Sequence, residues 1–104
     1  MFRDIEILKA GVGRLAADNT IEAMLVVRNK APPDAGLEVI QWILDGSAYR
    51  TGNAQFTQRL AIGRHNVSVR VRDATIEQTV KARVLVTAGQ KQTTEPDFTV
   101  LPVR

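Results

Sequence analysis

The chain of 104 residues has no cysteine and only one histidine, His65. Without cysteine there is no disulfide framework and no thiolate metal site. A lone histidine without cysteine or histidine partners does not favour a catalytic triad or a metal centre. We therefore expect no enzyme activity, bound metal or cofactor. We interpret His65 as a structural side chain at the rim of the core, bonded to the backbone of a neighbouring loop.

Long apolar runs are absent as well. No stretch approaches the roughly 20 apolar residues of a membrane-spanning helix. The first six residues, MFRDIE, place acids where a signal peptide needs an apolar segment. We expect no membrane insertion and no signal peptide in this chain. Either the chain stays where it is made, or it is a domain of a longer exported protein.

Aromatic residues make up only 5% of the chain, and the charge is unevenly distributed. Residues 1–58 contain six Lys and Arg against seven Asp and Glu, whereas residues 59–104 contain eight against four. The net charge of +3 therefore arises in the second half. Because aromatic residues do not interleave with these cations, specific nucleic-acid binding is not expected.

An alternation of polar and apolar residues is the strongest pattern present. In residues 63–73 (GRHNVSVRVRD), a period of two places Val67, Val69 and Val71 on one face and polar residues on the other. This period is typical of a half-buried β-strand and does not fit a helix. Similar patterns, separated by turn residues, predict strands at 4–9, 21–28, 37–44, 47–51, 55–62, 63–73 and 77–86.

About seven short strands without a convincing helix predict an all-β fold, an immunoglobulin-like antiparallel β-sandwich. We expect residues 1–89 to form this sandwich and residues 90–104 to be an extended tail or linker. Pro96 and Pro102 restrict this tail, because proline donates no hydrogen bond to a β-ladder. The tail is expected to pair only as an edge, to dock as a loop, or to lead to another domain.

The alternation also predicts which side chains form the core. On strand parity we expect Ile40 to share the inward face of Trp42 and Leu44, and Ile62 to point inward. Trp42 is interpreted as a core anchor rather than a sugar-stacking platform. Tyr49 and Phe98 are better candidates for exposed contacts. The principal core residues predicted are Ile21, Leu25, Val27, Trp42, Phe56, Leu60, Val67, Val69, Val71, Val80, Val84 and Val86.

Residues 42–46 (WILDG), 56–60 (FTQRL) and 63–73 resemble the immunoglobulin-like modules of bacterial and phage surface proteins, particularly PKD-like domains. Residues 26–29 (VVRN) are similar to a stretch of the adhesion-related CARDB domains. The resemblance covers about residues 21–86. It implies a non-catalytic structural or interaction module, a spacer or adhesion domain, in a larger cell-surface, secreted or phage-particle protein. Its partners would be another protein or neighbouring domains of the same chain. The alternative is an accessory carbohydrate-binding domain attached to a hydrolase.

Four cations are candidates for a binding surface. Arg70 and Arg72 face outward from one predicted strand, and Lys81 and Arg83 face outward from the next. If these strands form a hairpin, all four share one sheet face. Two interpretations stay open: a polyanion-binding face for phosphate, acidic polysaccharide or an acidic protein, or a solvated face that resists edge-to-edge association.

Two aspartates end strands beside turns, Asp45 and Asp73. Carboxylates from several loops at one end of a sandwich are a possible calcium site. However, aspartates in turns ordinarily bond their own backbone, and no Asp-x-Asp cluster occurs. We therefore expect Asp45 and Asp73 to stabilise turns.

Overall fold

The computed structural model describes residues 5–29, 37–73, 75–89 and 95–103, and the regular elements in these ranges are all β-strands. The all-β prediction is confirmed, and no helix capable of crossing a membrane occurs in the described ranges. Most of the predicted loop at 29–36 and of the polar segment at 90–95 lies outside them. The strands are β1 (Ile5–Leu15), β2 (Thr20–Asn29), β3 (Leu37–Leu44), β4 (Ser47–Tyr49), β5 (Gln55–Ala61), β6 (Gly63–Asp73), β7 (Ile76–Thr87) and β8 (Asp97–Pro102).

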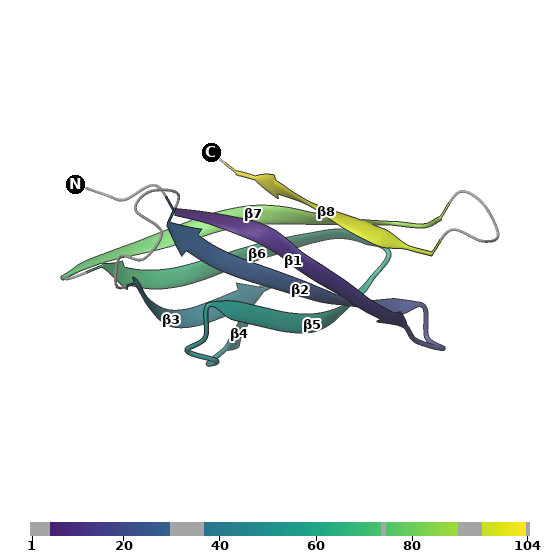
Figure 1. Ribbon diagram of the computed structural model, residues 1–104, viewed down its shortest axis with the longest axis horizontal. Helices are drawn as coiled ribbons and strands as arrows, with labels where there is room; N and C mark the ends of the chain where they lie inside the picture. The colour runs from purple at the N-terminus through teal and green to yellow at the C-terminus, as the bar shows by residue number, and fades with distance from the viewer. Residues whose placement is uncertain (1–4, 30–36, 74, 90–94, 104) are drawn as a thin grey trace.

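These strands form two antiparallel sheets, as Figure 1 shows. One sheet has three strands in the order β1-β2-β5, and the other has five in the order β4-β3-β6-β7-β8. The two sheets pack as layers of an elongated body with principal extents of 49 × 24 × 22 Å. The arrangement is that of a β-sandwich, and its long strands set the long dimension.

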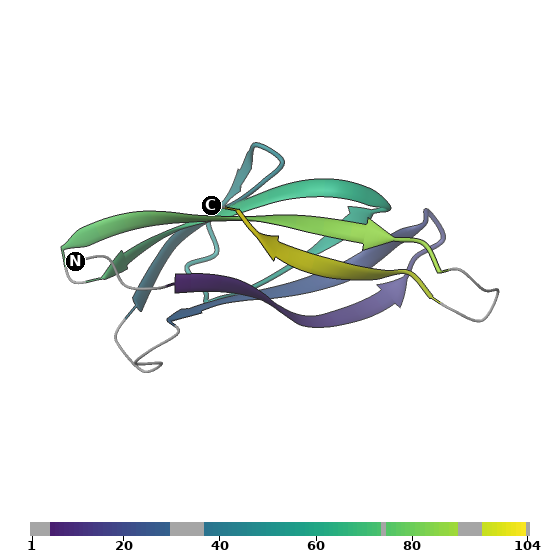
Figure 2. The ribbon, with the colours of Figure 1, turned by 90° about the horizontal axis from the view of Figure 1, so that it is seen from above.

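The eighth strand comes from the predicted tail. Residues 97–102 pair antiparallel with β7, from Thr87↔Asp97 to Ala82↔Pro102, and form an edge of the five-stranded sheet (Figure 2). The tail therefore takes the first of its three expected alternatives, and the structure has one strand more than the sequence predicts. Beyond Pro102, the Val103 amide donates a hydrogen bond to the Lys81 carbonyl at 3.4 Å. In an antiparallel ladder, only every second residue of a strand directs its N–H toward a given neighbouring strand. Since Val103 donates to β7, the backbone nitrogen of Pro102 points away from β7, and its missing N–H costs no ladder bond.

The core lies between the two sheets and follows the predicted alternation closely. Of the twelve principal core residues predicted, eleven are buried, and Val80 is half-buried against them. Trp42, Val69, Val71 and Val84 have no exposed surface. Burying a large apolar side chain contributes roughly 1.5–3 kcal/mol, so this set is the main source of stability. The buried hydrophobic residues beyond those predicted as principal are Ile5, Ile7, Ala23, Val39, Leu44, Ala82 and Phe98.

Strand parity gives the wrong face at three positions, Val39, Ile40 and Ile62. The ladder between β3 and β6 shifts register between Val39 and Gln41, so Val39 is buried and Ile40 is not on the inward face predicted for it. A β-bulge of this kind inserts one residue and reverses the parity on its far side. Ile62 is 48% exposed because β5 ends at Ala61, and alternation no longer applies in the turn that follows.

Edge contacts join the two sheets on the side where β1 and β8 meet. The Lys9 ammonium lies 2.5 Å from the Asp97 carboxylate and 5.0 Å from the centre of the Phe98 ring. The hydrogen bond from Lys9 and a second from the Phe98 amide lower the pKa of Asp97. Further toward the start of β1, Ile5 and Val103 line the same cleft. The first and last described residues therefore lie on one flank of the sandwich.

The three-stranded sheet is irregular at its outer edge. The β1–β2 ladder shifts register between Lys9 and Gly11 and again between Val12 and Leu15. Glycines occupy positions 11 and 13 near these shifts, and β1 continues past them to Leu15, beyond the strand predicted at 4–9. A Cβ atom on Gly13 would lie 2.8 Å from the Cβ of Glu22, so this position requires glycine.

Candidate functional site

His65 and Asp45 connect the β3–β4 turn to the start of β6. Asp45 (φ 49°) and Gly46 (φ 85°) form a tight two-residue turn of type I′. One Asp45 oxygen lies 2.7 Å from His65 Nδ1, and the other accepts the Asn66 amide at 2.8 Å. His65 Nε2 lies 2.7 Å from the Ala61 carbonyl oxygen. Both ring nitrogens therefore lie within hydrogen-bond distance of an oxygen atom, one on a side chain and one on the backbone.

The charge of Asp45 follows from this arrangement. Burial raises its pKa, but the hydrogen bond from His65, the bond from the Asn66 amide and the charge of His65 together lower it below the usual value. The structure thus places His65 at the rim of the core and bonds it to the backbone of the β5–β6 connection, the structural position inferred from the sequence. Among the described residues, this pair bonds only to backbone groups beside it, the Ala61 carbonyl and the Asn66 amide, so His65 and Asp45 stabilise a turn.

Asp45 and Asp73 do not share a site. In the antiparallel β3–β6 ladder, Asp73 pairs with Leu37 at one end, whereas Asp45 follows Leu44 at the other. The two carboxylates therefore lie at opposite ends of the sheet, and a calcium site that contains both is ruled out. Within the described ranges, no three His, Cys, Asp or Glu side chains gather closely enough to hold a metal ion.

The aromatic side chains of the described residues belong to the core and its rim. Trp42 stacks on Phe56 with ring centres 5.0 Å apart, and its indole nitrogen donates to the Asn53 carbonyl at 2.9 Å. Tyr49 packs edge-on against Phe56, and its hydroxyl accepts a hydrogen bond from Gln58. The prediction of an exposed Phe98 is wrong, because Phe98 lies on the inward face of β8 opposite Val86 and is 3% exposed. Of the described rings, those of Trp42, Phe56 and Phe98 are buried, and only that of Tyr49 is partly exposed.

The outer face of the five-stranded sheet carries the positive charge. The four cations predicted from the sequence share this face, since they occupy positions of β6 and β7 that alternate with buried residues. Arg64 joins them; the parity of β6 would have identified it, because it has the same parity as Arg70. The basic face, as we name it, consists of Arg64, Arg70, Arg72, Lys81 and Arg83, with Glu38 and Glu77 as its two carboxylates.

These cations are not electrostatically equivalent. Arg70 forms an ion pair with Glu77 at 2.8 Å, and Arg72 forms one with Glu38 at 3.4 Å. In contrast, Arg64, Lys81 and Arg83 form no ion pair with any acidic side chain of the described residues. The uncompensated charge on the face is therefore concentrated at one part of the β6–β7 hairpin.

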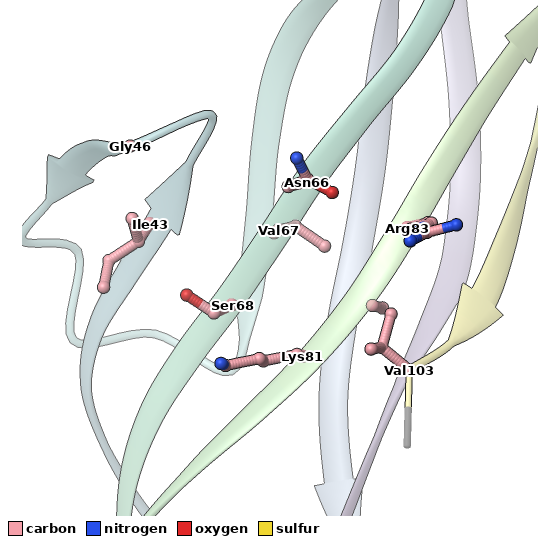
Figure 3. Close-up of a pocket in the computed structure, with 9 residues that line it drawn as sticks. Ile43, Gly46, Asn66, Val67, Ser68, Lys81, Arg83 and Val103 are labelled. Carbon is pink, nitrogen blue, oxygen red and sulfur yellow. The ribbon is translucent and has the colours of Figure 1, made fainter.

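A shallow hollow of about 330 Å³ lies at this part of the face (Figure 3). Lys81 and Arg83 line it from β7, directly opposite Ser68 and Asn66 of β6. The apolar side chains of Ile43 and Val103 border it. Every polar side chain of this lining can donate hydrogen bonds and none is acidic, so the hollow is suited to an anionic group.

Comparison of the chain with protein-family models, curated proteins and solved structures gives no match. The resemblance to immunoglobulin-like surface modules therefore stays a prediction from the sequence.

Proposed function

We propose that the chain is an immunoglobulin-like β-sandwich that acts as a non-catalytic structural and interaction module of a larger cell-surface, secreted or phage-particle protein. The strand order supports this type of sandwich. In immunoglobulin domains the first, second and fifth strands of the basic plan share one sheet, and the third, sixth and seventh share the other. Here β1, β2 and β5 form one sheet, and β3, β6 and β7 are neighbours in the other.

The position of Trp42 gives further support for the immunoglobulin-like type. Such domains carry a buried tryptophan on the third strand, between the sheets. Trp42 lies on β3, has no exposed surface and stacks against Phe56 of the opposite sheet. One strand departs from the seven-strand plan, because β4 pairs with β3, whereas the fourth strand of that plan joins the first, second and fifth; β8 is an added edge strand.

The composition of the interior supports a role without catalysis. Among the described residues, Asn29 is the only polar side chain in the buried set, and no titratable side chain belongs to it. An interior of this kind offers neither the acid and base nor the nucleophile that a reaction requires. Function is therefore assigned to the surface, and the concentrated charge of the basic face is the observation that carries the proposal.

The basic face favours an acidic partner, either another protein, a neighbouring domain of the same chain or an acidic carbohydrate. Three neighbouring cations of this face form no ion pair with described acids, and such a cluster of like charge attracts an anionic partner. The alternative, an accessory carbohydrate-binding domain, ordinarily needs an aromatic platform for sugar stacking. The described rings are packed in the core and its rim, so no observation favours that alternative.

An array of neutral and acidic glycans, combined with a panel of hydrolase substrates, tests this proposal on the complete chain. We expect no hydrolysis and no binding to neutral glycans. Hydrolysis by the purified chain would contradict a non-catalytic role. Binding to a neutral glycan that is lost in Tyr49→Ala, with the fold retained by circular dichroism, would establish the accessory carbohydrate-binding function instead.

A further inference from the structure

Lys81 and Arg83 occupy successive outward positions of β7 and, unlike Arg70 and Arg72 of β6, form no ion pair with a described carboxylate. Two residues along a strand separate their Cα atoms by about 7 Å. Directly opposite them on β6 are Ser68 and Asn66, paired as Ser68↔Lys81 and Asn66↔Arg83. The four side chains therefore surround one small area of the sheet, and all four line the hollow (Figure 3).

The charge of this group is not compensated within the described chain. Lys81 and Arg83 form no ion pair with a described carboxylate, whereas Arg70 and Arg72 are paired with Glu77 and Glu38. Arg64 lies diagonal to Arg83 across the same ladder, since it pairs with Leu85. Cations two positions apart on β7 and a further cation on β6 thus form a short track of positive charge.

We propose that this hollow binds the sulfate or carboxylate groups of an acidic polysaccharide, with Lys81 and Arg83 as the anion-binding residues. The proposal rests on the surface interaction role proposed above and names its ligand. The guanidinium of Arg83 binds an oxyanion through two parallel hydrogen bonds, and the Lys81 ammonium supplies a compact charge. Ser68 and Asn66 donate the neutral hydrogen bonds that orient the bound group.

A polysaccharide is favoured over a single-stranded nucleic acid by what surrounds the cations. Single-stranded nucleic acids are held by aromatic side chains on which bases stack. The hollow contains no aromatic residue, and its apolar borders are the aliphatic side chains of Ile43 and Val103. Aliphatic groups can contact the carbon–hydrogen faces of a sugar ring but offer no stacking surface to a base.

The test measures the affinity of the complete chain for heparin, used as a sulfated probe, at one fixed salt concentration. The test variant is Lys81→Gln with Arg83→Gln. The matched control is Arg70→Gln with Arg72→Gln, which removes the same charge from the same face. We expect the test variant to lose about tenfold or more in affinity, since it removes two charge-assisted contacts. The control should lose no more than about threefold, because those arginines are already paired.

Equal losses in the two variants would overturn the proposal, because binding would then depend on net charge alone. Failure of the unmodified chain to bind heparin would also overturn it. The proposed function would not be decided by that result, because the glycan and hydrolase experiment tests it separately.

A single-stranded DNA competitor of equal charge gives the third readout. If DNA displaces heparin at equal concentration, the hollow is a general polyanion site and the preference for polysaccharide is wrong. Ser68→Ala, which keeps the charge, should weaken binding by a smaller factor.

Discussion

Replacing Trp42 by phenylalanine measures how far the fold depends on one side chain between the two sheets. Trp42 is fully buried, stacks on Phe56 at 5.0 Å, and donates its indole N–H to the Asn53 carbonyl at 2.9 Å. Phenylalanine keeps an aromatic ring against Phe56, but removes the donor and leaves unfilled space. Loss of that hydrogen bond from a part-buried carbonyl costs about 1–3 kcal/mol.

The smaller ring adds a packing loss, because large-to-small substitutions in a core leave a cavity. Together we expect a loss of about 2–4 kcal/mol in the free energy of unfolding, within the range of severe core substitutions. For a domain of this size, each kcal/mol lowers the melting temperature by about 4–8 °C. The melting temperature should therefore fall by roughly 10–30 °C.

Thermal and urea unfolding are followed by circular dichroism, since Trp42 is the only tryptophan and its loss removes the fluorescence signal. Tyr49→Phe is the control, because it removes one hydroxyl at the same aromatic cluster and should cost only about 0.5–1.5 kcal/mol. A melting temperature unchanged in Trp42→Phe would refute the assignment of Trp42 to the core. Ready quenching of its fluorescence by acrylamide in the unmodified chain would refute it independently.

Three further predictions concern the turns and the ends of the strands. Asp45→Asn should reduce stability above about pH 3.8, the ordinary pKa of an aspartate, and have little effect well below it. Folding lowers the pKa of Asp45, so the contribution of its carboxylate to stability is lost as the pH falls from 3.8 through the lower pKa of the folded state. Acid titration of the unfolding free energy checks this, and a constant difference across the range would contradict it. Gly46→Ala should cost about 1–2 kcal/mol in urea unfolding, because the φ of +85° disfavours a side chain although no atom lies within 4 Å. Leu60→Ala should cost about 2–5 kcal/mol and Ile62→Ala under about 0.5 kcal/mol. Similar costs for both would show that Ile62 is buried after all.

The alternation within strands was sufficient to predict most of the core, because each strand buries one face and a period of two identifies it. It failed at Val39 and Ile40, since a bulge depends on how β3 meets β6 rather than on β3 alone. It also failed at Phe98, because the polar and proline-containing tail gives no local sign that β7 is available as its partner. These errors share a cause, which is the pairing of segments distant in sequence.

The candidate site shows the same division between local and non-local information. The hairpin of β6 and β7 places Arg70, Arg72, Lys81 and Arg83 on one face, as their outward parity predicts. The difference among them was not predictable in the same way. Arg72 is compensated by Glu38, 34 residues away in the chain, and the hollow at Lys81 is bordered by Ile43 and Val103 from other strands. Ion pairing across a sheet requires the register of its strands.

Because Ile5 and Val103 line one cleft, the two ends of the described chain lie on the same flank of the sandwich. In a sandwich with an odd number of antiparallel strands, the chain begins at one end and finishes at the other, which suits tandem domains joined end to end. The eighth strand instead returns the chain to its starting flank. If further segments were joined at both ends, they would leave the sandwich on the same flank, and a force pulling them apart would act first on the edge strands β1 and β8.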